Sequence, residues 1–194
     1  MANKHINMLK TFLKVMINDS YYQSLVIPNM YKKNIFDIDY KKLKKLKMTN
    51  LIFDIDNTIL PVDNSDVDDK LKDLFKKLTK DGFNICIVSN NNLERVKTPA
   101  EILNVNYIAN AKKPNKEAFD KAMDILKSNN LTTVMIGDQM LSDIRGAKEN
   151  GLYAILVDPL VNKYNIQTKT SRILQDLMEK KLKKQNKFIR GKYY

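Results

Sequence analysis

The chain contains very few of the side chains on which many enzymes depend. Its 194 residues include one histidine, one cysteine and no tryptophan. The histidine, His5, lies far from every motif described below, which excludes a Ser-His-Asp triad and metal sites built on histidine. The cysteine, Cys86, lies within an apolar run, so an intramolecular disulfide is excluded and we expect a small core residue.

The chain also lacks sequences that indicate nucleotide binding or a membrane span. A Gly-x-x-x-x-Gly-Lys loop is absent, which argues against a P-loop nucleotidase. Lys10 and Lys14 interrupt the apolar residues 6–17, so this segment is too short and too charged to cross a bilayer and is no signal peptide. We expect an amphipathic helix there, which either lies at a membrane interface or packs on the domain or on a partner.

The most informative segment that is present runs from Leu51 to Thr58, where an apolar stretch ends in Asp54 and Asp56. Residues two apart on a strand point to the same face, so both carboxylates should project together from the strand end. Like charges held this close repel each other unless a cation lies between them or one is protonated. The pair suits a carboxylate nucleophile, a hard divalent metal and a second carboxylate for proton transfer. A turn rich in Asp and Asn is the simpler alternative.

Three other short apolar runs also end in polar residues. The runs and the residues that follow them are 83–88 with Ser89 and Asn90, 105–108 with Lys113, and 133–136 with Asp138 and Asp143. Such runs fit strands buried on both faces of a parallel sheet, and helix-like stretches separate them. The alternation predicts an α/β doubly wound domain, a Rossmann-like three-layer α/β/α sandwich with its ligand crevice at the carboxyl ends of the strands.

Helices are expected between these strands and near both ends of the chain. The predicted helices cover residues 40–47, 66–80, 92–103, 115–127, 142–150 and 171–185. In the first of them, Leu43 and Leu46 should face the core. The last should dock on the sheet, on lipid or on both through an apolar stripe of Ile173, Leu174, Leu177 and Met178.

The order of the polar motifs resembles that of the haloacid dehalogenase-like (HAD-like) phosphohydrolases. Asp-x-Asp-x-Thr comes first, Ser-Asn second, Lys-Pro third, and Gly-Asp with a later Asp fourth, all within residues 51–158. Phe-Asp-Ile-Asp-Asn-Thr and Ile-Gly-Asp-Gln-Met-Leu-Ser-Asp are similar to the motifs of the small bacterial YqeG branch, which is related to phosphatidylglycerophosphate phosphatases of plants and fungi. Residues 28–48 also resemble that branch. The resemblance implies a phosphatase.

The resemblance also implies a role for each motif residue. Asp54 would attack phosphorus to form an aspartyl-phosphate. Asp56 would first protonate the leaving oxygen and then deprotonate the water that hydrolyses the intermediate. Ser89 would hydrogen-bond a phosphoryl oxygen, helped by the backbone N–H of Asn90. Lys113 would neutralise charge on the phosphate and on Asp54.

A Mg²⁺ site is implied in the same way. Asp54 and Asp138 would bind the ion through their side chains and Asp56 through its backbone carbonyl. Asp143 would orient a metal-bound water, or is simply an acidic residue that suits a helix start. Thr58 is expected to shape the turn rather than to take part in chemistry.

Many relatives insert a cap domain after the first motif or between the second and the third. Here each interval has room for one helix and one strand, so we expect a minimal cap or none. An open crevice suits a large or surface-bound substrate, which could be a lipid head group, a polymer or a protein. The expected organisation is one globular unit, made of a basic, amphipathic lead-in that packs on the core (1–48), a HAD-like catalytic domain (49–162) and a basic helix with a tail (163–194).

The net charge of +12 is concentrated outside the motif region. Residues 30–50 carry +5 and residues 163–194 carry +8, whereas residues 51–162 carry −3. Basic flanks suit an anionic membrane surface or RNA. The excess of lysine over arginine and the many asparagines also fit an AT-rich genome, in which case part of the charge has no function.

The motifs, the open crevice and the basic flanks predict a cytoplasmic, Mg²⁺-dependent phosphomonoester hydrolase. The resemblance to the YqeG branch, together with the open crevice and the basic flanks, implies phosphatidylglycerophosphate at the anionic inner face of the cell membrane as the expected substrate. A soluble phosphatase of broad specificity for nucleotides or sugar phosphates is one alternative. An RNA- or ribosome-associated protein with a vestigial site is another, although every charged position that the chemistry needs is filled.

Overall fold

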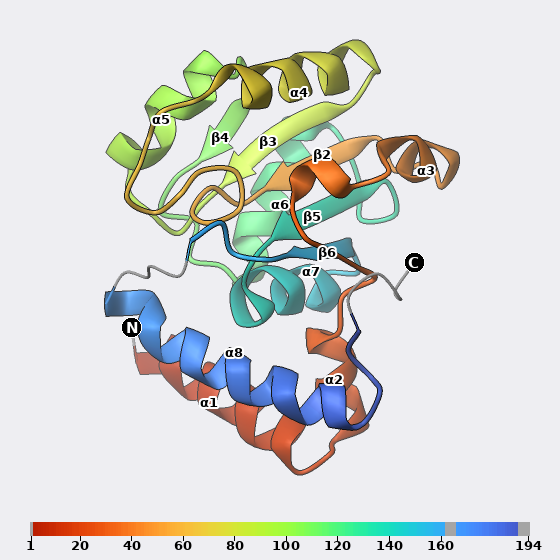
Figure 1. The fold of residues 1–194 in the computed structure, drawn as a ribbon, viewed down its shortest axis with the longest axis vertical. Helices are drawn as coiled ribbons and strands as arrows, with labels where there is room; N and C mark the ends of the chain where they lie inside the picture. The colour runs from red at the N-terminus through yellow and green to blue at the C-terminus, as the bar shows by residue number, and fades with distance from the viewer. Residues whose placement is uncertain (1, 162–165, 190–194) are drawn as a thin grey trace.

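The computed structural model describes residues 2–161 and 166–189, and a parallel six-stranded sheet lies at its centre (Figure 1). The strand order is β1-β6-β5-β2-β3-β4. The strands are β1 (Met30–Lys32), β2 (Asn50–Phe53), β3 (Asn84–Val88), β4 (Asn106–Ile108), β5 (Thr133–Gly137) and β6 (Tyr153–Val157). The predicted doubly wound α/β class is confirmed, and β1 and β6 extend the sheet beyond the strands that the sequence predicted.

The strands are apolar on both sides because helices cover both faces of the sheet. Leu51 and Phe53 of β2 belong to the core on one face, and Ile52 belongs to the core on the other. β3 alternates in the same way, with Ile87 on the first face and Cys86 on the second. Cys86 is buried, as predicted, and burial raises the pKa of its thiol to about 12.

One face of the sheet is covered by α3 (Tyr40–Lys45), α4 (Asp69–Lys80) and α5 (Leu93–Ile102). The side chain of Asp68 accepts a hydrogen bond from the backbone N–H of Leu71 and so caps the start of α4. From α4, Phe75 reaches Phe53 of the sheet, with the ring centroids 5.1 Å apart. A short 3₁₀ turn, η1 (Ile35–Asp37), precedes α3.

The prediction for the short helix α3 is correct for one leucine and wrong for the other. Leu43 is buried, but Leu46 is 45% exposed. The helix ends at Lys45, so Leu46 no longer continues its buried face.

The opposite face is covered by α6 (Lys116–Leu126), by the π-helical turn η2 (Met140–Ile144) and by α7 (Arg145–Glu149). The predicted helix over 142–150 is therefore two consecutive elements. α6 packs through Ala118, Phe119, Ala122 and Leu126, at the helical spacing of an amphipathic face.

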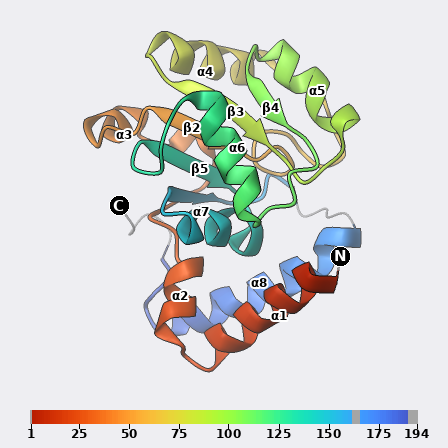
Figure 2. The same ribbon diagram turned by 180° about the vertical axis from the view of Figure 1, so that it is seen from behind.

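Beyond α7 lies a further layer of helices, α1 (Ala2–Met16), α2 (Ser20–Val26) and α8 (Ile166–Lys184). α1 and α8 lie side by side in both views (Figure 1, Figure 2). Gln185, just after α8, hydrogen-bonds the side chains of Asn18 and Gln23. Within the described ranges, no helix combines the length and the apolar character needed to cross a bilayer.

The apolar stripe predicted for the C-terminal helix does not match its buried face. Met178 is buried and Leu174 is partly buried against the core, whereas Ile173 is 53% and Leu177 is 41% exposed, so the stripe is divided between two faces of the helix. The buried face of α8 includes the polar residues Arg172 and Gln175. These two side chains bind the loop after β5, so hydrophobicity alone could not identify the face.

Phe75→Ala should lower the free energy of unfolding by about 3–5 kcal/mol, because it removes a buried ring that packs against Phe53. Urea denaturation measures the change. Leu131→Ala is the control, since Leu131 is 73% exposed and its change should stay within about 0.5 kcal/mol. Equal losses in the two variants would contradict the assigned core.

Candidate active site

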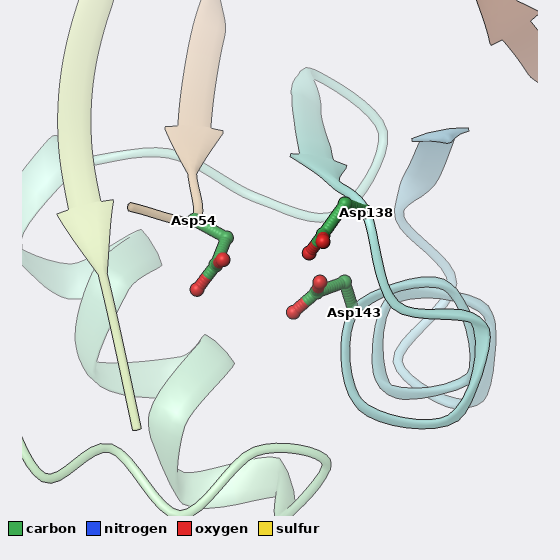
Figure 3. A group of neighbouring side chains, drawn as sticks. All are labelled: Asp54, Asp138 and Asp143. Carbon is green, nitrogen blue, oxygen red and sulfur yellow. The ribbon is translucent and has the colours of Figure 1, made fainter. Parts of the chain in front are cut away.

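The candidate site lies where the winding of the sheet reverses. β2 has β3 on one side and β5 on the other, and ligands of doubly wound sheets bind beyond the carboxyl ends of such strands. Asp54 follows β2, Asp138 follows β5 and Asp143 lies in η2. Figure 3 shows the three carboxylates directed into one space, and one oxygen of each lies within 4.8 Å of the others.

Lys113 is the buried cation of this group. Its Nζ lies 2.7 Å from Oδ1 of Asp54 and 2.8 Å from Oδ1 of Asp143, and the residue is 1% exposed. Burial alone would lower the pKa of Lys113, but Asp143 and Asp54 raise it above its usual value. The lysine is therefore held charged between two carboxylates.

Asn90 fixes the backbone of Lys113. The N–H of Lys113 donates to Oδ1 of Asn90 at 2.6 Å, and Nδ2 of Asn90 donates to the carbonyl of Lys113 at 3.1 Å. The sequence predicted a contact of the Asn90 backbone with phosphate. In the structure the Asn90 side chain also joins the loop after β3 to the loop after β4, through its two hydrogen bonds with the backbone of Lys113.

Asp54 is buried at the start of a tight turn. The carbonyl of Ile55 accepts hydrogen bonds from the N–H groups of Thr58 and Leu60, and Asn57 adopts a left-handed φ of 60°. Thr58 Oγ1 lies 3.5 Å from Oδ2 of Asp54. Burial raises the pKa of Asp54 to about 7, Lys113 opposes this shift, and Asp143 adds to it.

Asp143 reaches the group because residue 137 is a glycine. A Cβ on Gly137 would lie 2.3 Å from Oδ2 of Asp143, far inside van der Waals contact. The same oxygen accepts a hydrogen bond from the N–H of Gln139 at 3.1 Å. The outer-shell role of Asp143 stays a prediction, and the structure places its carboxylate in one group with Asp54 and Asp138.

Asp138 is held by two residues of α8 that the sequence reasoning missed. Arg172 forms an ion pair with Oδ2 of Asp138 and donates from Nη1 to its carbonyl at 2.8 Å. Gln175 donates to the same carbonyl at 3.2 Å and accepts from the N–H of Met140 at 2.9 Å. Burial lowers the pKa of Arg172 to about 10. The one sequence signal for Arg172 was the scarcity of arginine in the chain, and no signal distinguished Gln175 from the other polar residues of a basic helix.

Asp56 lies apart from the three carboxylates. Its Oδ1 is 2.8 Å from Nε of Arg95, and its Oδ2 accepts from Nδ2 of Asn91 at 3.0 Å. Arg95 also donates to the loop that follows the first motif, at the carbonyls of Pro61 and Asn64 and at Oγ of Ser65. Sequence reasoning missed Arg95, whose one signal was the scarcity of arginine in the chain.

Ser89 is buried at the end of β3, where its backbone N–H bonds Ile108. Its Oγ accepts a hydrogen bond from the N–H of Asn91 at 3.0 Å. Because the hydroxyl is the acceptor in this bond, it retains its hydrogen for donation to a phosphoryl oxygen.

The residues present fit a divalent metal ion. Three buried carboxylates face two buried cations, Lys113 and Arg172, so negative charge is in excess. Oδ1 of Asp138 is buried without a hydrogen-bond partner among the described residues. Carboxylate oxygens are the donors that hard ions such as Mg²⁺ prefer. The fold and the site define a doubly wound α/β protein whose buried carboxylate cluster fits a divalent metal ion.

Comparison with known proteins identifies the family. Residues 110–167 match the family described as HAD-hydrolase-like. The chain is 36% identical over 146 residues to the probable phosphatase YqeG of Bacillus subtilis (strain 168), covering 75% of this chain and 85% of that protein. The chain therefore belongs to the HAD-like hydrolases and, among them, to the family of the YqeG phosphatase. It is an enzyme of this phosphatase class, which uses a divalent metal ion.

Two solved structures are more distant matches. An uncharacterized protein from Listeria monocytogenes serotype 4b is 22% identical, with a TM-score of 0.49, and the match covers 68% of this chain and 99% of that one. The 3-deoxy-D-manno-octulosonate 8-phosphate phosphatase from Yersinia pestis is 13% identical, with a TM-score of 0.46, over 75% of this chain and 86% of that one.

Mg²⁺ should stabilise the metal-free protein more at pH 8 than at pH 6. The pKa of Asp54 is raised to about 7, so at pH 6 the carboxyl must lose a proton before it can bind the ion. Below pH 7 the apparent affinity should fall by about tenfold per pH unit. Thermal shift titrations measure it, with Asp138→Asn as a control that should respond weakly at both pH values. An equal response of the native protein at pH 6 and pH 8 would contradict the prediction.

Arg95→Met should lower kcat on a soluble phosphate ester by about tenfold or more, because Asp56 and the loop over residues 61–65 lose their shared anchor. Arg145→Met is the matched control. The Arg145 side chain is equally buried but binds Glu149, away from the site. The same loss of kcat in both variants would show that Arg95 has no specific role.

Proposed function

We propose that this phosphatase is a Mg²⁺-dependent phosphatidylglycerophosphate phosphatase that works at the inner face of the cell membrane through a phosphorylated Asp54. The observation that carries the proposal is the buried Asp54 bonded to Lys113 at the open edge of the sheet, in a member of the YqeG family.

In the first step, a carboxylate oxygen of Asp54 attacks the phosphorus in line with the ester bond. The bond between phosphorus and the leaving oxygen breaks, and Asp56 donates its proton to that oxygen. Lys113 reduces the repulsion between the negative phosphoryl group and Asp54, since its Nζ already contacts the attacking carboxylate.

In the second step, Asp56 takes a proton from a water molecule as the water oxygen attacks the phosphorus. The bond between phosphorus and Asp54 breaks, inorganic phosphate leaves, and both carboxyl groups return to their starting states. Arg95 and Asn91 orient Asp56 for both transfers, because each holds one of its two oxygens.

The remaining residues bind the phosphoryl group and the metal. Ser89 and the backbone of Asn90 would donate to the phosphoryl oxygens, and Thr58 supports Asp54. Asp54, Asp138 and the carbonyl of Asp56 would hold Mg²⁺, with Asp143 orienting a bound water. When bound, the ion supplies positive charge that aligns the phosphate and offsets the charge of the transition state.

The absence of a cap domain supports a bulky substrate. From Thr58 to Lys113 the chain forms α4, β3, α5 and β4, all of which belong to the core layers. The loop over residues 61–65 is the short segment left beside the site, and Arg95 binds it. A site of this kind leaves space for the rest of a lipid outside the crevice.

Charge supports an anionic surface as the place of reaction. The segments that flank the catalytic region, 30–50 and 163–194, carry +5 and +8. Anionic lipids attract basic segments within about a Debye length, about 8 Å at physiological salt. The substrate lipid itself is anionic and lies in such a membrane.

Phosphate release from phosphatidylglycerophosphate in anionic liposomes tests the proposal. Asp54→Asn should lower release by about a thousandfold or more, because the nucleophile is lost. Asp69→Asn is the control, since the Asp69 side chain is 93% exposed and lies on α4. A chelator should also abolish release, and Mg²⁺ should restore it.

Two results would reject parts of the proposal. Cleavage of a soluble ester with no release from the lipid would keep the chemistry and reject the substrate. Salt-sensitive RNA binding that survives Asp54→Asn, with no hydrolysis by the native protein, would favour a binding protein instead.

A further inference from the structure

α1 carries apolar residues on two opposite faces. Its inner face, with Val15 buried and Met8 and Phe12 partly buried, packs in the same core as α6 and α8. Its outer face and the residue that follows it are exposed, with Ile6 62%, Leu9 49%, Leu13 52% and Ile17 68% accessible. Positions three and four apart form one stripe along a helix, so these four residues make a continuous apolar ridge that is exposed to solvent.

α8, which contacts α1, also exposes apolar residues. Ile173 and Leu177 are exposed and lie one turn apart on the helix that runs beside α1 (Figure 1, Figure 2). We call these exposed residues the α1–α8 surface, and its members are Ile6, Leu9, Leu13, Ile17, Ile173 and Leu177.

Lysines border the α1–α8 surface. On α1, Lys10 is exposed at the side of the apolar ridge, and on α8 the exposed lysines include Lys169, Lys180 and Lys184, which share the helical phase of Ile173 and Leu177. Lysine can place its methylene groups among lipid chains while its ammonium reaches the head groups. A helix face of apolar residues with lysines beside them is typical of proteins that lie in an anionic membrane interface.

We infer that the α1–α8 surface binds the surface of an anionic lipid bilayer. RNA would use the lysines but not the apolar ridge, whereas a bilayer uses both. The inference deepens the proposed function by assigning the lipid contact to particular residues. Vesicle binding itself needs no catalysis, so it can be tested separately from the choice of substrate.

The position of α8 connects this surface with the catalytic site. Arg172 on its inner side binds Asp138, while the next residue, Ile173, is exposed on the outer side. The thickness of one helix, about 10 Å, therefore separates the carboxylate site from the lipid-binding side. A bilayer that contacts the start of α8 would lie next to the edge of the sheet where the phosphoryl group must enter.

Co-sedimentation with vesicles of equal parts phosphatidylglycerol and phosphatidylcholine tests the inference. The double variant Ile6→Glu/Leu13→Glu should lower the vesicle partition coefficient by about tenfold or more, because it removes apolar contacts and adds negative charge. Ile102→Glu/Leu131→Glu is the matched control. It adds the same charge at residues that are 48% and 73% exposed outside the α1–α8 surface, and its partitioning should stay within about twofold.

Circular dichroism and the rate on a soluble phosphate ester should be unchanged in both variants, which shows that they fold. Unchanged vesicle binding by Ile6→Glu/Leu13→Glu would overturn the inference. A second result would also overturn it. If the native protein fails to bind vesicles and light scattering shows a dimer that Ile6→Glu/Leu13→Glu dissociates, the α1–α8 surface joins two copies of the chain.

The two proposals fail in different ways. Vesicle binding without release of phosphate from phosphatidylglycerophosphate rejects the proposed substrate and keeps the lipid-binding surface. Hydrolysis of that lipid in detergent micelles, with no binding of the native protein to anionic vesicles, keeps the substrate and rejects the surface.

Discussion

The site depends on Lys113, which is buried between Asp54 and Asp143. Without a cation there, carboxylates so close in a dry environment would repel each other, and at least one would take up a proton. Removing one member of such a buried pair costs about 3–5 kcal/mol because the other charge is left uncompensated. Much of the local structure serves this contact, since Asn90 fixes the lysine backbone and Gly137 gives Asp143 the room to approach.

Much of the fold could be predicted because the central strands are buried on both faces. Double burial produces short apolar runs that end in polar residues, and β2, β3 and β5 are strands of this kind. β4 lies at the edge of the sheet and is only half-buried, but its run over residues 105–108 is still apolar enough to be recognised. β1 could not be found in this way. It has three residues, Met30 to Lys32, and lies at the edge of the sheet, so it has too few positions to show a pattern.

The site could be predicted only in part, because its residues come from two kinds of position. Asp54, Ser89, Lys113 and Asp138 follow strands, so a rule about strand ends finds them. Arg95, Arg172 and Gln175 reach the site from helices, and only the packing of those helices shows where their side chains end. The same polar contacts put Arg172 and Gln175 on the inner face of α8, so the apolar residues alone could not show that Met178 faces the core while Ile173 and Leu177 are exposed.

The pairing of β1 with β6 has a consequence for how the chain matures on the ribosome. β1 is made early, but its neighbour in the sheet, β6, begins at Tyr153, and α1 meets α8 later still. At synthesis rates of about 5–20 residues per second, β1 waits on the order of ten seconds for its partner. During that interval the inner face of α1, which includes Val15, is not yet covered by α8. The nascent chain thus exposes both apolar faces of α1 before the residues of the catalytic site that follow β5 are synthesised.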